Sequence, residues 1–352
     1  MSDFVATVLQ NYINQYDASL DKLEQRPSNY GAMNLFKAQN MHPTSIISPE
    51  VEANIEQSFN VSVQVPVVNY REVTIANVRT CAVQTEGLTS SLVTLTHVTY
   101  AVGFVARPEQ HYENYVGYQS AINRNITASV QKLAEAVDID CSATLEANKN
   151  QYFPQELLDY YAVVADAFQV GQAEKNDFYN NLGAILQTAD HEGTAQVAVN
   201  PIGMPLVNRL ESQGQQNGIN EAFQMLGYDW FPTNRVVNGG APGTYESTLY
   251  AVVPGSVGMA SRVDPAAKTR QRIHEGKFWD VFPNAPQIGM DLGVFYQKDC
   301  ADISAVQSAG LANSTRTTVE SWEFSLDVFY VSAYNSDPVN RYGNIFKAEI
   351  LA

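Results

Sequence analysis

Apolar side chains follow a helical period in several parts of the chain. Residues 3–25 show this period, with Ser2 or Asp3 as a cap and Arg26-Pro27 as a typical stop. From residue 110 to 138 the apolar positions again step by three or four: Tyr115, Tyr118, Ile122, Ile126, Val130, Leu133 and Val137. This single stripe predicts one helix of about 25–30 residues that packs along one side of a sheet. Shorter helices are predicted over 155–168, 176–187, 204–213 and 219–227.

Alternating apolar and polar residues predict strands elsewhere. Residues 61–75 alternate, and Pro66 favours an edge position for this strand. A second run of β-branched residues spans 90–105. Two long strands with little between them predict a projecting hairpin, which needs a surface to lie on because an isolated hairpin is only marginally stable. Further strands are predicted over 194–201, 247–261, 288–299, 317–335 and 342–352, and a loose turn region over 234–246.

The segment 28–52 has no period of its own and is rich in Pro, Ser and Asn. Together with the helix that precedes it, this segment predicts an N-terminal arm rather than a core element. The chain contains no internal repeat.

Charged residues make up 16% of the 352 residues, against about 25% in an ordinary soluble domain. A hydrophobic content of 45% excludes wholesale disorder. Uncharged polar residues, namely Asn, Gln and 19 Tyr, are frequent in place of the missing charged residues. Because interfaces are poor in Lys and Glu and rich in aromatic residues, this balance favours a chain that buries much of its exterior against copies or partners. A halophilic or merely acidic soluble protein remains an open alternative.

The net charge of −16 argues against a nucleic-acid groove, which needs clustered Lys and Arg, but not against a protein that encloses nucleic acid. We expect no secretory signal, since acidic residues interrupt residues 1–25, and no membrane span. Three isolated cysteines, Cys81, Cys141 and Cys300, are typical of buried thiols in a reducing compartment. The sequons at Asn60, Asn125 and Asn313 therefore carry little weight.

Motifs for nucleotide or hydrolase chemistry are incomplete. The glycine-rich segment 239–243 contains a proline and lacks the lysine of a phosphate loop, so it favours a flexible loop. Residues 255–258 have the wrong spacing for a nucleophile elbow and predict a turn between strands.

Metal and acid–base candidates are equally weak. The five histidines are scattered: His42, His97, His111, His191 and His274. Asp138 and Asp140 are predicted at the end of the long helix without a calcium loop after them. Glu320 and Glu323 flank Trp322 in one strand and do not face each other across a substrate. We therefore expect no catalytic, cofactor-binding or metal-binding residues, and no enzyme activity.

The order of elements and several strings resemble the HK97-fold major capsid proteins of tailed bacteriophages. The strings are the β run 90–105, the helix that follows it, and segments 133–150, 194–210 and 321–350. In segment 133–150 an Ala-rich turn runs into Ile139-Asp140, which is similar to the end of the family's spine helix. The resemblance is one of pattern and order across residues 55–352, without a signature motif.

The resemblance implies an α+β, HK97-like fold. Its parts would be an N-terminal arm (1–60), an extended hairpin loop (61–107), a peripheral domain with the spine helix (108–189), most of an axial domain (190–310) and closing strands (311–352). It implies a structural subunit that forms pentamers and hexamers of an icosahedral shell around double-stranded DNA. The shell would be part of the virion and would assemble in the host cytoplasm, with a scaffold, portal or decoration protein as further partners.

Some family members cross-link through a lysine of the extended loop. This chain has no lysine between Lys37 and Lys132, so we expect a non-covalent shell. Two alternatives stay open. One is an encapsulin-like compartment that carries enzyme cargo. The other is a tail, fibre or glycan-binding module, which predicts monomers or trimers with tyrosines lining a groove.

Overall fold

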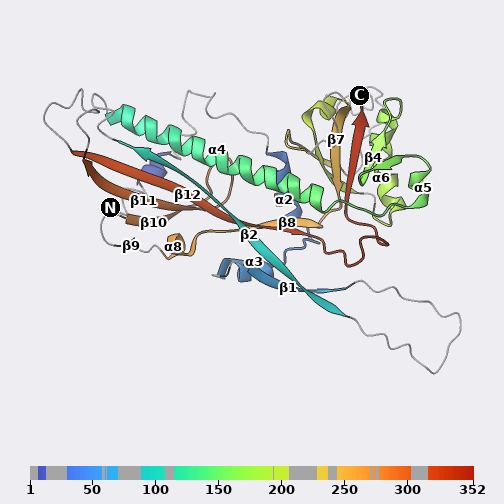
Figure 1. The fold of residues 1–352 in the computed structure, drawn as a ribbon, viewed down its shortest axis with the longest axis horizontal. Coiled ribbons are helices and arrows are strands. Elements are labelled where there is room, and N and C mark those ends of the chain that lie inside the picture. Colours follow the sequence, from blue (N-terminus) through green and yellow to red (C-terminus); the bar gives the residue numbers. More distant parts are fainter. Residues whose placement is uncertain are drawn as a thin grey trace, which may run out of the picture.

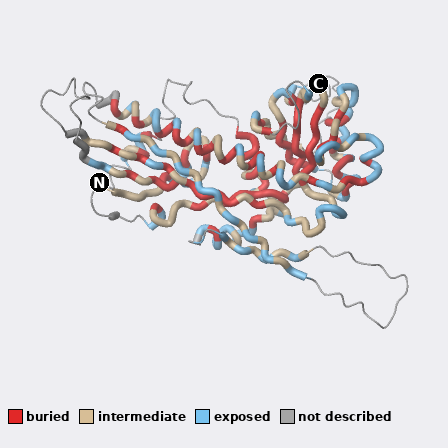
Figure 2. The backbone as a smooth tube through the Cα atoms, in the orientation of Figure 1, coloured by how far each residue is buried: buried red, intermediate tan, exposed pale blue. Residues whose placement is uncertain are grey.

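The computed structural model describes residues 7–12, 30–57, 60, 62–69, 89–107, 115–192, 194–205, 228–236, 244–269, 272–273, 277–302 and 316–352. These residues form an α+β fold built on two β-sheets (Figure 1), which agrees with the expected class. The longest helix runs along the larger sheet and reaches the smaller one. Figure 2 shows buried backbone concentrated between this helix and the large sheet, and again within the small sheet.

The larger sheet has seven strands within the described part of the chain. Six follow the order β1 (Ser62–Val68), β2 (Ser90–Ala106), β12 (Arg316–Ser332), β11 (Leu292–Asp302), β10 (Lys277–Phe282) and β9 (Arg272–Ile273). The seventh, β8 (Val257–Arg262), pairs with the far end of β12. All neighbours are antiparallel. Pro66 lies in β1, an edge strand, as its missing N–H predicts.

Helix α4 (Tyr115–Ala147) covers one face of this sheet. Its buried stripe confirms the predicted one from Tyr118 to Val137 and continues through Cys141 and Leu145. The helix is 33 residues long, so Asp138 and Asp140 lie inside it and not at its end. No Gly or Pro interrupts residues 118–147, and the polar side chains of the last turns have partners across the packing surface.

The smaller sheet has six strands among the described residues. Their order is β3 (Ala162–Val164), β4 (Ala167–Val170), β13 (Ile345–Leu351), β7 (Tyr245–Val252), β5 (Ala195–Val199) and β6 (Tyr228–Pro232). Helix α6 (Lys175–Thr188) packs its apolar side onto this sheet, and the short α5 (Gln155–Leu158) lies beside it. Every residue of β5 is buried, which confirms the strand predicted over 194–201. Two short helical turns, η2 (Pro201–Gly203) and α8 (Pro265–Lys268), complete the described elements.

The helix predicted over 155–168 is wrong. Only α5 is helical there, and β3 and β4 form a hairpin after it. Ala165 and Asp166 connect the two strands with positive φ values of 50° and 61°, the backbone of a type I′ turn. Such a turn needs two left-handed residues; aspartate is common at these positions but alanine is not, so Ala165-Asp166 is a weaker signal than Asn-Gly or Asp-Gly.

The irregular arm expected over 28–52 is also wrong in part. It contains α2 (Gly31–Asn40) and the start of α3 (Pro49–Gln57). Six of the ten residues of α2 are buried, among them Met33, Leu35 and Phe36. The helix lies between α4, β8 and β6, so tertiary packing decides its structure and not a periodic sequence.

Strand pairing joins segments from both sides of the expected domain bounds, and the division of the chain itself stays a prediction. β3, β4 and α6, expected within a peripheral domain at 108–189, belong to the small sheet. β8, β10 and β11, expected in the axial part at 190–310, belong to the large sheet. The strand pair predicted over 247–261 is correct, but its two strands enter different sheets at the turn around Gly255, which has φ 78°. Sequence order alone does not reveal these crossings.

Several predictions fall outside the described residues. Of the helix predicted over 3–25, residues 7–12 are described and are helical. The helices predicted over 204–213 and 219–227 lie almost entirely outside, as does the glycine-rich segment 239–243.

Candidate assembly interface

Strand β2 changes partners at its middle. Residues 97–106 pair with β12, whereas residues 90–96 pair with β1. Beyond His97, β1 and β2 therefore continue as a two-stranded ribbon that projects from the body (Figure 1). We call residues 62–68 and 90–96 the ribbon.

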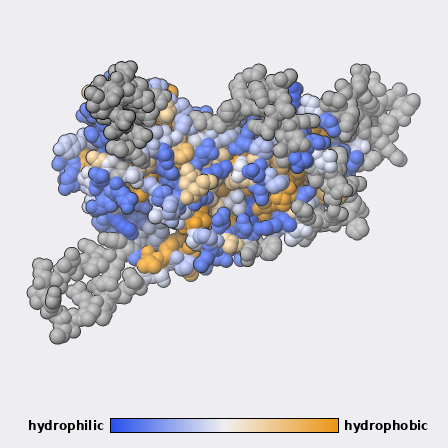
Figure 3. Space-filling model, turned by 180° about the vertical axis from the view of Figure 1, so that it is seen from behind, coloured by the Kyte–Doolittle hydropathy of each residue, from blue (hydrophilic) through white to orange (hydrophobic). Residues whose placement is uncertain are grey.

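The two faces of the ribbon differ. On one face Val63 and Leu95 pack against α3 and the segment before it, around a cluster that contains Ile47 and Ile55. A groove of about 500 Å³ continues along this face and is lined by apolar residues of both layers: Ile46, Ile47, Val51, Val63, Val65, Val67, Val93, Leu95 and Val331. Seen from behind, apolar residues gather where the body meets the projecting segment (Figure 3).

The opposite face of the ribbon is open. Pro66 pairs with Leu92 across the two strands, and Val68 follows at the outer end. Leu92 is 64% exposed and Val68 65% exposed. The rest of this face is polar and consists of Ser62, Gln64, Ser90, Thr94 and Thr96. Pro66, Val68 and Leu92 thus form an exposed apolar patch at the outer end of the ribbon, and such a patch is typical of a surface that is buried in an assembly.

Helix α4 is fastened to the rest of the body by buried polar contacts. Tyr118 donates to Glu320 on β12, and Tyr100 on β2 donates to Asp140. Tyr250 on β7 donates to Glu146 near the end of the helix. Because these contacts reach both sheets, α4 joins the two sheets into one body.

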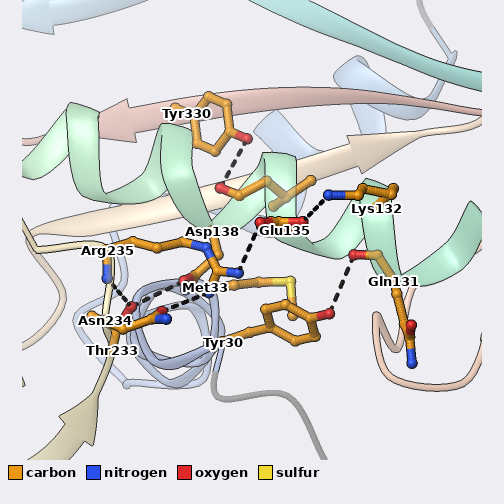
Figure 4. Close-up of polar contacts among 11 residues, drawn as sticks. Tyr30, Met33, Gln131, Lys132, Glu135, Asp138, Thr233, Asn234, Arg235 and Tyr330 are labelled. Atoms are coloured by element: carbon orange, nitrogen blue, oxygen red, sulfur yellow. Dashed lines mark hydrogen bonds and ion pairs between the residues drawn. The ribbon is translucent and has the colours of Figure 1, made fainter. Parts of the chain in front are cut away.

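Asp138 of α4 has three partners, all from outside the helix (Figure 4). Its Oδ1 accepts the backbone N–H of Met33 at 2.8 Å, and its Oδ2 accepts the Thr233 hydroxyl at 3.0 Å. Arg235 Nη1 donates to the same Oδ2 at 3.3 Å. Burial raises the pKa of this carboxyl, and these donors oppose the rise. Asp138 thereby ties α2 and the segment after β6 to α4.

A second buried polar site joins β13 to α4, and Lys347 of β13 lies at its centre. Its side chain is 2% exposed, and Nζ lies 3.0 Å from both Glu146 Oε2 and Glu349 Oε1. Burial alone would raise the pKa values of the two carboxyls. Hydrogen bonds from Lys149, Tyr250 and Lys347 outweigh that effect at Glu146 and hold its pKa below the usual range. Hydrogen bonds from Gln169 and Lys347 do the same for the pKa of Glu349.

Most of the candidate site residues considered from the sequence lie at different places in the structure. Asp138 and Asp140 bind partners on different elements. Glu320 is buried and Glu323 is exposed, because they lie on opposite faces of β12. Ser256 lies in a turn, where its hydroxyl donates to the Val253 carbonyl. Cys141 is free and buried, and burial raises its pKa well above the usual value; Cys81 lies outside the described residues.

The histidines have separate surroundings. His42 contacts Thr44 at the surface, and His191 contacts the Gly343 carbonyl. His97 lies beside Asp327. His111 and His274 lie outside the described residues. Within the described ranges, no three metal-binding side chains come together, and no helix is long and apolar enough to cross a membrane.

Sequence reasoning missed the partners of the buried carboxylates. Arg235, Arg262 and Lys347 each neutralise an acidic group that lies far away in sequence. A usable signal exists for Lys347, because it is a lone lysine inside a run of apolar residues near the C-terminus. A charged residue at such a position is almost never buried unless it is paired.

No protein-family model and no curated protein matches the chain. Solved structures from phages match it over most of its length. A protein of Mycobacterium phage Che8 covers 86% of this chain and 88% of its own, at 10% identity and a TM-score of 0.47. The capsid of the cyanophage P-SCSP1u covers 84% of both chains, at 10% identity and a TM-score of 0.39.

The capsid of a native GTA particle covers 88% of this chain and 92% of its own, at 10% identity and a TM-score of 0.41. A TM-score below 0.5 means that two backbones coincide only in part. These structures therefore add no site residue to those described above.

Proposed function

We propose that this chain is a structural protein, the repeating subunit of a closed viral shell of the HK97 type, and not an enzyme. The ribbon carries the proposal. Two strands that project from the body and expose Pro66, Val68 and Leu92 on one face are only marginally stable by themselves, so contact with a surface on another molecule would stabilise the ribbon. A second copy of the chain supplies that surface in a shell.

Two further properties support a shell subunit. The body is braced by buried polar contacts between α4 and both sheets, which suits a building block that keeps its shape. The chain is poor in charged residues and rich in amide and tyrosine residues, which suits many modest contacts with neighbouring copies.

The strand pairing suggests a revised assignment of parts. The large sheet with α4 would be the peripheral domain, and the small sheet with α5 and α6 the axial domain, whose loops meet around five- and six-fold axes. The ribbon would be the extended loop, and the residues before Tyr30 the arm. Pentamers and hexamers of such subunits close an icosahedral shell.

An acidic shell holds double-stranded DNA by enclosure and not by sequence-specific contacts, since each subunit has a net charge of −16. A scaffold, a portal and decoration proteins are the further partners we propose. Assembly would take place in the host cytoplasm and the product would be the virion. Because the loop has no lysine, denaturing gels of mature particles should show monomers, and a ladder of covalent multimers would contradict a non-covalent shell.

The size distribution of the purified protein tests the proposal. Light scattering and negative-stain microscopy should show closed particles tens of nanometres across, or pentamers and hexamers that close on a change of conditions. A stable monomer or trimer at all concentrations would overturn the shell and favour a tail, fibre or glycan-binding module. Enzyme cargo inside closed particles would instead indicate an encapsulin-like compartment.

A further inference from the structure

A polar cluster lies at the root of the ribbon, where β2 passes from β12 to β1. Asp327 on β12 pairs in register with Arg262 on β8 and with Thr99 on β2, so the three side chains share one face of the sheet. The Arg262 side chain is 4% exposed and that of Asp327 11%. The Thr99 hydroxyl donates to Asp327 Oδ1 at 2.7 Å, which fixes the carboxylate.

Arg262 reaches both strands of the ribbon from this position. Its Nη2 donates to Asp327 Oδ2 at 2.8 Å, and its Nε donates to the same oxygen at 3.3 Å. Its Nη1 donates to the main-chain carbonyl of Asn60 at 2.9 Å, just before β1 begins. Its Nη2 also lies 3.5 Å from Nδ1 of His97, the last residue of β2 paired with β12. One guanidinium thus contacts the chain where it enters and where it leaves the ribbon.

We propose that Arg262 is the positioning residue of the ribbon: it holds both strands at the root and sets the direction in which the ribbon leaves the body. This inference rests on the proposed function, in which that direction decides how the ribbon meets a neighbouring copy. The guanidinium carbon of Arg262 also lies 5.6 Å from the centroid of the Phe329 ring, a cation–π contact that a lysine can make as well. The hydrogen bonds are directional, and the rigid fork of an arginine presents them in one plane.

If Arg262 only neutralised the charge of Asp327, a lysine in its place would serve equally well. Lysine in place of Arg262 keeps a positive charge beside Asp327 but has a single point of charge, so it cannot hold Asp327 and the Asn60 carbonyl in the same planar geometry. Arg262→Lys therefore separates neutralisation of Asp327 from control of the ribbon. Arg235→Lys is the matched control, because Arg235 neutralises buried Asp138 at 3.3 Å and lies over the Tyr30 ring, away from the ribbon root.

The experiment measures amide hydrogen exchange in the unassembled full-length subunit and then the particles that it forms. In Arg262→Lys, the amides of 62–68 and 90–96 should exchange at least about tenfold faster, a change that corresponds to about 1.4 kcal/mol of opening free energy. The core pairs of β12 with β11 should be unchanged. Arg235→Lys should leave ribbon exchange as in the wild type. Particles of Arg262→Lys should be irregular or open.

A second variant covers the case in which Arg262→Lys does not fold. The double variant Arg262→Met with Asp327→Leu removes the pair without leaving a buried charge and should fold with the same fast-exchanging ribbon. If the ribbon of either folded variant exchanges no faster than that of Arg235→Lys, the positioning role is overturned. If ribbon exchange accelerates but the wild-type protein never forms particles, Arg262 keeps its role and the shell proposal fails.

Discussion

Asp138 is the residue whose removal should cost the body most. It accepts hydrogen bonds from Met33, Thr233 and Arg235, and its own exposure is 0%. Asp138→Ala leaves these three donors without their acceptor, including a half-buried guanidinium. Arg235 keeps Glu135 at 3.5 Å, so the main cost comes from the buried Met33 N–H and the Thr233 hydroxyl. Because each unsatisfied buried polar group costs about 1–3 kcal/mol, we expect a loss of about 2–5 kcal/mol in the free energy of unfolding.

Urea denaturation of the unassembled subunit measures this loss. Asp159→Ala is the control, since Asp159 is exposed and contacts Gln155 at the surface. The control should stay within about 0.5 kcal/mol of the wild type. Equal midpoints for Asp138→Ala and the control would contradict a bracing role for Asp138.

Glu349 makes the stability depend on pH. Its pKa is lowered in the folded protein, so its contribution is present above the unfolded pKa of about 4.3 and is lost as the pH falls through the folded value. Glu349→Gln should be less stable than the wild type at pH 7, by about 1.5–3 kcal/mol. The difference should shrink as the pH falls below about 4.3 and through the lowered folded pKa, where the wild-type carboxylate becomes protonated.

Denaturation at several pH values checks this prediction. Glu192→Gln, at an exposed position, should follow the wild-type pH profile. If the difference between Glu349→Gln and the wild type stayed constant from pH 7 down to the onset of acid unfolding, the charge of Glu349 would not be what stabilises the site.

At the scale of elements, the start of helix α2 packs closely against the end of strand β6. A Cβ added at Gly31 would lie 2.1 Å from the backbone oxygen of Pro232 at the end of β6. Backbone cannot yield as a flexible side chain does, so Gly31→Ala should destabilise the protein by about 1–3 kcal/mol or more. At Gly171 the nearest atom would be 3.8 Å away, and Gly171→Ala should be nearly neutral.

Thermal unfolding compares the two glycine variants. A midpoint for Gly31→Ala equal to that of Gly171→Ala would mean that α2 can shift away from β6, against the tight packing described above.

The sequence predicted elements best where one periodic face meets one neighbour. The stripe from Tyr118 to Val137 and the apolar run of β5 are local signals, and the structure confirms both. Prediction from the sequence failed where contacts with neighbouring elements determine the local structure. Helix α2 forms because α4, β8 and β6 enclose it, and the turn at Ala165 depends on pairing of β3 with β4.

At the scale of the whole molecule, pairing between distant segments was beyond prediction. β7 and β8 are adjacent in sequence but enter different sheets, and β2 meets β12 more than two hundred residues later, with 228 positions between Thr99 and Asp327. The buried ion pairs follow these crossings. The sequence around Arg262 or Arg235 therefore does not show which acidic residue each of them pairs with.

The open ribbon face gives the whole-molecule prediction. Leu92→Ser with Val68→Ser changes two exposed side chains, so the isolated subunit should keep its stability within about 1 kcal/mol. Burial of such side chains is worth about 1.5–3 kcal/mol each, so the concentration needed for particles should rise at least about tenfold. Light scattering against concentration measures this threshold.

Met41→Ser is the matched control, because Met41 is 85% exposed and lies away from the ribbon. It should leave the threshold unchanged. An unchanged threshold in the ribbon variant would mean that its open face is not an assembly contact.

The place of β13 has a consequence for the timing of biosynthesis. This strand follows the other five described strands of the small sheet in sequence, yet it lies between β4 and β7 inside that sheet. Until residues 345–351 have left the ribosome, β4 and β7 each have an unsatisfied strand edge. The described small sheet can therefore close only after these residues have been made, and a chain that stops before residue 345 lacks the strand that joins the two halves of the sheet.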